Sequence, residues 1–241
     1  MEHKDLIIGV LGGMGTYATI HLFKQYAEIF EAKKEWDRPR MIIDNRCTMP
    51  SRVRAILYSE NKEILIDEMS QSVAGLISSG CNKIFLACNT AQLFIPDIIR
   101  LVPDAREKLI NIIDVCAAGL SDDHVKEVYL LASEGTISSG IYQKAFDNCN
   151  ITCRAPESEE FPLIRECIEA VKQNQYNDEV RDIFIEMINR NNTCILGCTE
   201  LPVLYEKYRD KCQHIRVYDP VYMTLEKLRS DNEKNTDIWS V

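Results

Sequence analysis

The stretch DLIIGVLGGMGTYAT, residues 5–19, carries an apolar run directly into a glycine-rich turn and then into a helical pattern. An unbroken apolar run that ends in glycines is typical of a strand buried on both faces of a parallel sheet. The helical pattern continues to residue 34, with Ile20 and Phe23 among the residues on its apolar face. The chain therefore opens with a strand, a loop and a helix, the first unit of an α/β fold.

The same alternation continues along the rest of the chain. Further strands are expected at residues 40–44, 83–87, 109–114, 127–132, 151–155, 193–197 and 215–219. Further helices are expected at residues 61–79, 139–148, 161–173, 178–190 and 220–229. Strands separated by helices predict parallel sheets with right-handed crossovers.

The pattern restarts near residue 127, which indicates an internal repeat. A Gly-Thr pair follows the first strand of each half, at Gly15 and at Gly135, and a cysteine follows a later strand, at Cys88 and at Cys198. Ligands of open α/β sheets bind beyond the carboxyl ends of the strands. If the halves face each other, these loops converge on one site.

We therefore predict two pseudo-symmetric α/β domains, each with a parallel sheet flanked by helices, and an active site in the cleft between them. The first domain is expected to comprise residues 1–115 and 215–241, and the second residues 116–214. A length of 241 residues, 46% of them hydrophobic, is sufficient for one large core or two small ones.

Composition narrows the classes of partner. The net charge of −9 disfavours a general nucleic-acid binder, and the chain has no apolar run of about 18 residues that could span a bilayer. The N-terminal MEHKDLIIGV is charged and passes straight into a strand pattern, without a signal-peptide core. We expect a cytoplasmic protein that binds a small molecule and neither nucleic acid nor membrane.

The ten cysteines are expected to be reduced in that compartment. The pairs Cys149/Cys153 and Cys194/Cys198 have C-x-x-x-C spacing, which raises the question of zinc. Structural zinc needs four closely grouped ligands, and the four histidines are scattered, so no metal site is expected. Most of these thiols are expected to be small core residues.

Two of the cysteines have a different context, in KIFLACNTAQ (83–92) and TCILGCTELP (193–202). Cys88 and Cys198 each follow a strand and precede residues suited to starting a helix, where the helix dipole can lower a thiol pKa. Two such thiols in corresponding positions predict stereoinversion by general acid–base catalysis, one removing a proton from a carbon and the other donating one. A nucleophilic cysteine would need a histidine partner, and neither Cys88 nor Cys198 has a histidine nearby in the sequence.

The glycine-rich loop supports a rival interpretation. Gly13 and Gly15, with Ala18, match the G-x-G-x-x-[GA] fingerprint of dinucleotide-binding proteins, and Asp44 closes the second strand where a ribose-binding acid could lie. The same glycines would also allow backbone N–H groups to meet a carboxylate. Arg52 follows the second strand and could grip a carboxylate with two hydrogen bonds, or it could be a solvated surface residue.

Five motifs together resemble the aspartate/glutamate racemase family, whose members use two cysteines and no cofactor. The motifs are GVLGGMGTYAT (9–19), MPSR (49–52), ACNTA (87–91), EGTISSGIY (134–142) and LGCTELPVL (196–204). The resemblance implies that Cys88 and Cys198 are the catalytic acid/base pair, that the substrate is aspartate or possibly glutamate, and that the protein is a homodimer. It implies substrate binding by Met14, Thr16, Arg52, Asn89, Thr90, Lys172 and Thr199.

The chain departs from the family pattern at three positions. Gln92 stands where histidine is common, Thr16 where proline is common, and Ser51 where an acid is common. These departures leave a third alternative, a catalytically weak relative that binds amino acids. Glutamate racemases carry Gly-Cys-Thr-His in the second loop, whereas Glu200 stands here, so the aspartate branch fits better.

Overall fold

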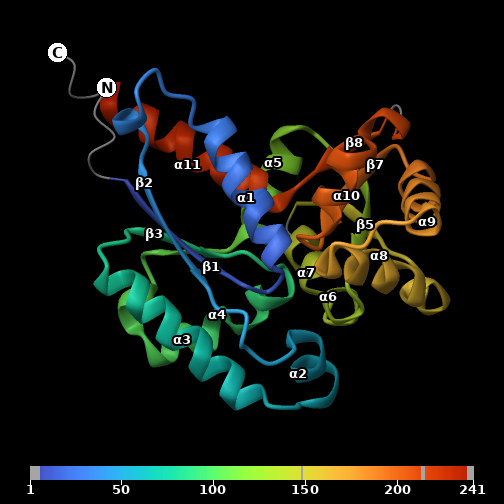
Figure 1. The fold of residues 1–241 in the computed structure, drawn as a ribbon, viewed down its shortest axis with the longest axis horizontal. Helices are drawn as coiled ribbons and strands as arrows, with labels where there is room; N and C mark the ends of the chain where they lie inside the picture. Colours follow the sequence, from blue (N-terminus) through green and yellow to red (C-terminus); the bar gives the residue numbers. More distant parts are fainter. Residues whose placement is uncertain (1–5, 148, 213–214, 238–241) are drawn as a thin grey trace.

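The computed structural model describes residues 6–147, 149–212 and 215–237. It contains two four-stranded parallel sheets flanked by helices, which confirms the predicted α/β class (Figure 1). The first sheet has the order β2-β1-β3-β4, and its strands are β1 (Ile7–Gly12), β2 (Arg40–Asn45), β3 (Lys83–Leu86) and β4 (Leu109–Ile110). The second has the order β6-β5-β7-β8, with β5 (Glu127–Ala132), β6 (Thr152–Arg154), β7 (Thr193–Gly197) and β8 (Arg216–Tyr218). The two orders correspond strand by strand, as an internal repeat requires.

Helices connect the strands in both halves. The first half contains α1 (Thr16–Ile29), α2 (Arg52–Tyr58), α3 (Lys62–Ser78), α4 (Ile95–Leu101) and α5 (Ile112–Asp122). The second contains α6 (Glu134–Ser138), α7 (Ile141–Asp147), α8 (Phe161–Gln173), α9 (Asp178–Asn189) and α10 (Leu201–Tyr208), and α11 (Pro220–Asp237) follows β8. In Figure 1, α3 and α4 lie on one side of the first sheet, and α1 and α11 lie on the other. None of the helices in the described residues is long and apolar enough to cross a membrane.

One hydrophobic core joins the two sheets. It includes Val10 from β1, Leu22 from α1, Leu130 from β5, Ile195 from β7 and Leu225 from α11, all of them buried. Separate clusters fill the outer side of each sheet. The two halves are therefore packed against each other through apolar side chains, and burial of this kind contributes about 1.5–3 kcal/mol for each large side chain.

The C-terminal segment differs from the prediction. β8 pairs in parallel with β7, from Thr193 opposite Arg216 to Ile195 opposite Tyr218, and so completes the second sheet. The sequence analysis predicts that residues 215–241, of which residues 238–241 lie outside the described part of the chain, belong to the first domain. The helix that follows, α11, joins the shared core and packs against α1 and α5. A strand of three residues carries too little pattern to reveal which sheet it will join.

Short helices also differ from the sequence expectation. The strand predicted at residues 109–114 is shorter and extends only over β4. It ends there because the side chain of Asn111 accepts a hydrogen bond from the Ile113 N–H at 3.0 Å and caps the start of α5. The helix predicted at 16–34 ends at Ile29. Helix α2 was not predicted, although Ser51 caps it by accepting from the Arg54 N–H at 3.3 Å. A helix of seven residues is too short to show a clear periodicity.

Gly13 is expected to be essential to the fold of the first loop. Its φ is +77°, and a Cβ there would collide with the backbone of Arg46 and Cys47. Gly13→Ala should therefore lower the free energy of unfolding by about 1–3 kcal/mol, measured by urea denaturation. The matched control is Gly75→Ala in α3, where a Cβ meets nothing within 4 Å. That change should raise stability by about 0.5–1 kcal/mol, and an equal loss in both variants would contradict this role for Gly13.

Candidate active site

The two cysteines singled out in the sequence lie at corresponding strand ends. Cys198 directly follows β7, and Cys88 follows β3 by two residues. Both strands are the third in sequence order of their sheet and lie beside its first strand. The loops that carry them touch across the two halves, because the Thr199 hydroxyl donates to the carbonyl of Ala87 at 3.5 Å.

The thiol of Cys198 is held in its protonated form. Its Sγ donates to Oε2 of Glu200 at 3.0 Å. Burial, the charge and hydrogen bond of Glu200, and the charge of Cys88 raise the pKa of Cys198 well above its usual range, and Lys172 opposes them. The lowered pKa expected from a helix start is therefore wrong for Cys198, since α10 begins only at Leu201 and burial dominates.

Glu200 is part of this site, and the sequence analysis did not predict it as a site residue. Its side chain is buried, and Oε2 also accepts from the Thr199 hydroxyl at 3.4 Å. Oε1 is buried without a hydrogen-bond partner and faces Gly15, where a Cβ would collide with it. Burial raises the pKa of Glu200, while the hydrogen bond from Cys198 and the charges of Lys172 and Arg52 oppose the rise. The feature of the sequence that could have indicated this role is the position of Glu200, an acid two residues after the second cysteine.

The loop after Cys88 is fixed by side chains of the second half. The Tyr142 hydroxyl donates to Oδ1 of Asn89 at 2.5 Å, and both side chains are buried. Nδ2 of Asn89 is then left buried without a partner. The Thr90 hydroxyl lies 2.7 Å from that of Thr136 and 3.1 Å from that of Ser133. These contacts hold Asn89 and Thr90 in place across the junction of the two halves.

Gln92 braces the backbone of the same loop. Its Nε2 donates to the carbonyls of Leu86 at 3.0 Å and Cys88 at 2.9 Å. Its Oε1 accepts from the N–H of Ile112 at 3.3 Å, at the start of α5. The amide therefore supports the turn that carries Cys88, and all three of its interactions run to backbone groups.

Arg52 lies at the first position of α2 and is held by backbone carbonyls. Its Nη1 donates to Pro50 at 2.9 Å, and its Nη2 donates to Met14 at 3.1 Å. Its Nε is buried without a partner. Because its charge helps to lower the pKa of Glu200, Arg52 acts on the same site as the second cysteine loop.

Lys172 and Thr16, which are also predicted to bind substrate, make their hydrogen bonds to residues outside the two cysteine loops. Lys172 lies in the last turn of α8 and pairs with Glu169 at 2.8 Å. Burial opposes the charge of Lys172, yet that hydrogen bond and the charges of Glu200 and Cys198 raise its pKa. Thr16 is exposed, and its hydroxyl accepts from Asn45 at 3.4 Å, so this hydrogen bond runs away from the cysteine loops.

The dinucleotide alternative is disfavoured by what already occupies the glycine loop. A pyrophosphate would need the start of α1 beside Gly15, where a buried carboxylate oxygen of Glu200 lies. Asp44, the expected ribose ligand, instead pairs with Arg46, with its Oδ2 3.3 Å from Nε. A second anion beside Glu200 would be repelled at short range.

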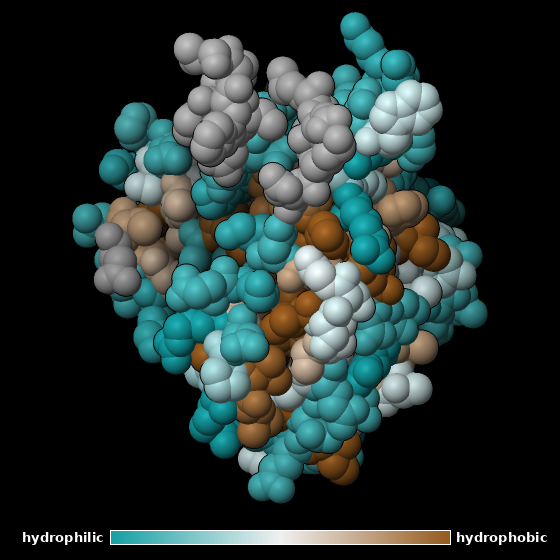
Figure 2. All heavy atoms as spheres, turned by 90° about the vertical axis from the view of Figure 1, so that its left-hand side faces the viewer, coloured by the Kyte–Doolittle hydropathy of each residue, from teal (hydrophilic) through white to brown (hydrophobic). Residues whose placement is uncertain are grey.

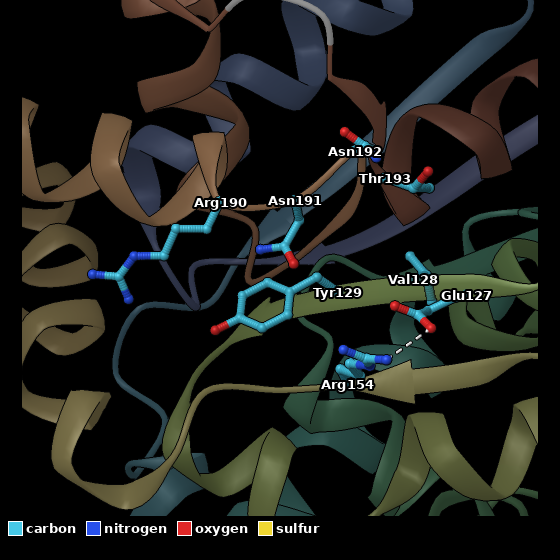
Figure 3. Close-up of a pocket in the computed structure, with 8 residues that line it drawn as sticks. All are labelled: Glu127, Val128, Tyr129, Arg154, Arg190, Asn191, Asn192 and Thr193. Atoms are coloured by element: carbon cyan, nitrogen blue, oxygen red, sulfur yellow. Dashed lines mark hydrogen bonds and ion pairs between the residues drawn. The ribbon is translucent and has the colours of Figure 1, made fainter.

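A separate hollow of about 410 Å³ lies at the other end of the second sheet (Figure 3). Its lining includes Glu127 and Thr193, the first residues of β5 and β7, whereas Cys198 follows the last residue of β7. Arg154 lines the hollow and pairs with Glu127 at 3.0 Å. All ten cysteines are free thiols, and within residues 6–147, 149–212 and 215–237 no cluster of His, Cys, Asp and Glu could hold a metal ion.

Known proteins resemble this chain in fold and in sequence. The aspartate racemase of Picrophilus torridus is 28% identical with a TM-score of 0.78, and the match covers 93% of this chain and 94% of that one. An aspartate racemase homologue from Pyrococcus horikoshii is 23% identical with a TM-score of 0.72, covers 97% of this chain and 100% of its own, and shows the fold alone.

A glutamate racemase from Limosilactobacillus reuteri is 23% identical over 158 residues, which are 64% of this chain and 58% of that protein. The family model described as Asp/Glu/Hydantoin racemase matches residues 11–228. That match spans most of the chain and includes both cysteine loops, and the chain therefore belongs to the Asp/Glu/Hydantoin racemase family.

Proposed function

We propose that this protein racemises an acidic amino acid, aspartate first and glutamate second, without a cofactor, by proton transfers at Cys88 and Cys198. The observation that carries the proposal is the contact between two cysteine loops that leave corresponding strands of two sheets. The loops are joined by the hydrogen bond from Thr199 to Ala87, and the charge of Cys88 acts on the pKa of Cys198.

Racemisation requires an acid and a base on opposite faces of one carbon. Cys198 carries its proton, as its raised pKa requires, and so can donate to the carbon from one side. Cys88, approaching from the other half of the molecule, removes the α-proton of the enantiomer that faces it. The opposite enantiomer reverses the two roles.

Negative charge that builds on the substrate carboxylate needs fixed hydrogen-bond donors. Two buried donors near the cysteines have no partner in the protein, Nδ2 of Asn89 and Nε of Arg52. Lys172 adds a positive charge that acts on both Cys198 and Glu200. Because unpartnered buried donors are costly, a dicarboxylic amino acid fits these groups better than a neutral one.

The bracing role of Gln92 supports an active enzyme over a weak amino-acid-binding relative. Histidine at this position could change its charge near neutrality, whereas the amide of Gln92 secures the turn of Cys88 through three hydrogen bonds to the backbone. The loop geometry thus does not depend on a titratable residue at position 92.

The thiols are tested by Cys88→Ser and Cys198→Ser. Each variant should lose racemisation of L-aspartate by about 10²–10⁴-fold or more, because a hydroxyl is a far weaker acid than a thiol. Circular dichroism of L-aspartate, with no cofactor added, follows the reaction. Cys47→Ser is the matched control, since Cys47 is exposed and its variant should keep full activity.

A second readout concerns the face of proton transfer. In deuterium oxide the wild type should place solvent deuterium mainly in the product enantiomer, and the two variants should each exchange the α-proton of opposite enantiomers. Full activity in either the Cys88 or the Cys198 variant would end the two-thiol mechanism. A wild type that leaves every acidic and neutral amino acid unchanged would favour the weak binder instead.

Substrate recognition is tested by Arg52→Ala. Loss of a charged donor should lower kcat/KM for aspartate by about 10- to 100-fold, with a smaller effect on alanine or serine. Arg54→Ala is the matched control, because Arg54 is exposed and pairs with Glu60. An equal loss for acidic and neutral substrates would mean that Arg52 only supports the loop through Met14 and Pro50.

We also propose a cytoplasmic homodimer formed through β2. This strand stands at the end of its sheet, and Met41, Ile42 and Ile43 are partly exposed. Figure 2 looks onto this side of the molecule and shows hydrophobic side chains gathered between hydrophilic ones. Antiparallel pairing of two copies centred on Ile42 would place Arg40 opposite the partner's Asp44, which complements its charge.

Light scattering after size exclusion tests this interface. The wild type should have the mass of a dimer, and Ile42→Lys should have that of a monomer, because two lysines would meet on the axis. Leu163→Lys, at another exposed apolar residue in α8, should remain a dimer. A monomeric wild type, or a dimeric and folded Ile42→Lys, would contradict the proposal.

A further inference from the structure

A buried carboxylate with no role in the two-thiol scheme lies beside Cys198. Glu200 is only 2% exposed, and its Oε2 accepts from Sγ of Cys198 at 3.0 Å. The second oxygen, Oε1, is buried without a partner. An ionised carboxylate in such a place is costly, and the thiol of Cys198 is a side-chain hydrogen-bond donor in direct contact with it.

We propose that Glu200 accepts the proton of the Cys198 thiol, through Oε2, whenever Cys198 must act as the base. This inference rests on the proposed racemase function. Glu200 acts through Cys198 and is therefore a positioning residue, which need not touch the substrate.

The proposed proton transfer starts from a state in which each thiol carries its proton and Glu200 is ionised. The S–H bond of Cys198 breaks, an O–H bond forms at Oε2 of Glu200, and the thiolate removes the α-proton of the substrate. Cys88 then protonates the opposite face of the carbon and becomes a thiolate. The three groups carry two protons before the reaction, three while the substrate is a carbanion, and two after Cys88 has donated, and one negative charge has then moved from Glu200 to Cys88.

The surrounding charges make this exchange possible. Burial raises the pKa of Glu200, which brings it closer to that of a thiol than an exposed carboxyl would be. Lys172 stabilises the thiolate of Cys198 and the carboxylate of Glu200, and Arg52 stabilises the carboxylate of Glu200. An ionised Glu200 would repel the thiolate of Cys198, whereas a protonated Glu200 donates a hydrogen bond to it.

The glycine loop keeps the carboxylate in position. Oε1 packs so close to Gly15 that a Cβ there would collide with it. Thr199 holds the other oxygen through its hydroxyl. The carboxylate is thus confined between the start of α1 and the thiol, and its proton-accepting oxygen remains within reach of Sγ.

The coupling is measured by alkylation of Cys198 with iodoacetamide as a function of pH, followed by peptide mass spectrometry. In Glu200→Gln the midpoint should fall by about one pH unit or more, because the variant lacks the negative charge that raises the pKa. Glu206→Gln removes a carboxylate from α10 that pairs with Lys24, and it should leave the midpoint unchanged. An unchanged midpoint in a folded Glu200→Gln protein would overturn the proposal.

The proton-accepting role is measured by the pH profile of racemisation. Wild-type kcat/KM should fall as the pH drops through the raised pKa of Glu200, since the carboxyl must be ionised to accept a proton. Glu200→Gln should lose about 10-fold or more at pH 7 and recover part of the loss at pH 9, where Cys198 ionises unaided. A merely structural role would lower activity equally at every pH, and that result would reject the relay.

Two further outcomes separate this inference from the racemase proposal. If Glu200→Gln does not fold, Glu200→Asp retains a shorter carboxylate and should show an intermediate midpoint, and a midpoint equal to that of the wild type would reject the coupling. A wild type without racemase activity would reject the proposed function. The alkylation experiment would still decide whether Glu200 controls the protonation of Cys198.

Discussion

The contact between two loops that leave different sheets is the constraint on which the candidate site depends. Thr199 reaches across to the carbonyl of Ala87, and this brings the two cysteine loops together. The contact is held by the apolar core that both sheets share, in which side chains such as Leu130 and Leu225 are buried. A separation of the halves would expose that core, so the site is as rigid as the packing between them.

Burial then decides the chemistry at the junction. Water is largely excluded, so charges act strongly on one another and unpartnered polar atoms are costly. Cys198 and Glu200 respond with raised pKa values, which places one proton between them. The buried donors of Asn89 and Arg52 that have no partner are the groups to which we assign the substrate carboxylates in the proposed function. The raised pKa values of Cys198 and Glu200 and the cost of the unpartnered donors therefore have the same cause, which is burial away from water.

The two halves repeat the same strand order but differ around their cysteines. In the first half, Gln92 binds three backbone groups and fixes the turn of Cys88. In the second half, Glu200 binds the thiol of Cys198 itself. A neutral amide braces the first loop, and an acid accepts a hydrogen bond from the thiol in the second. The two halves therefore share their strand order and differ in the side chains that contact their cysteine loops.

Strand runs and strand-end motifs are local patterns, so the α/β class and the repeated halves could be predicted from the sequence, whereas the catalytic roles of Cys88 and Cys198 stay a prediction. It missed short helices and the sheet that Arg216–Tyr218 joins, because a strand of three residues carries almost no pattern. The raised pKa of Cys198 and the contact of its thiol with Glu200 are seen only in the folded chain. Both depend on burial and on charges from helices far apart in the chain, which no local pattern records.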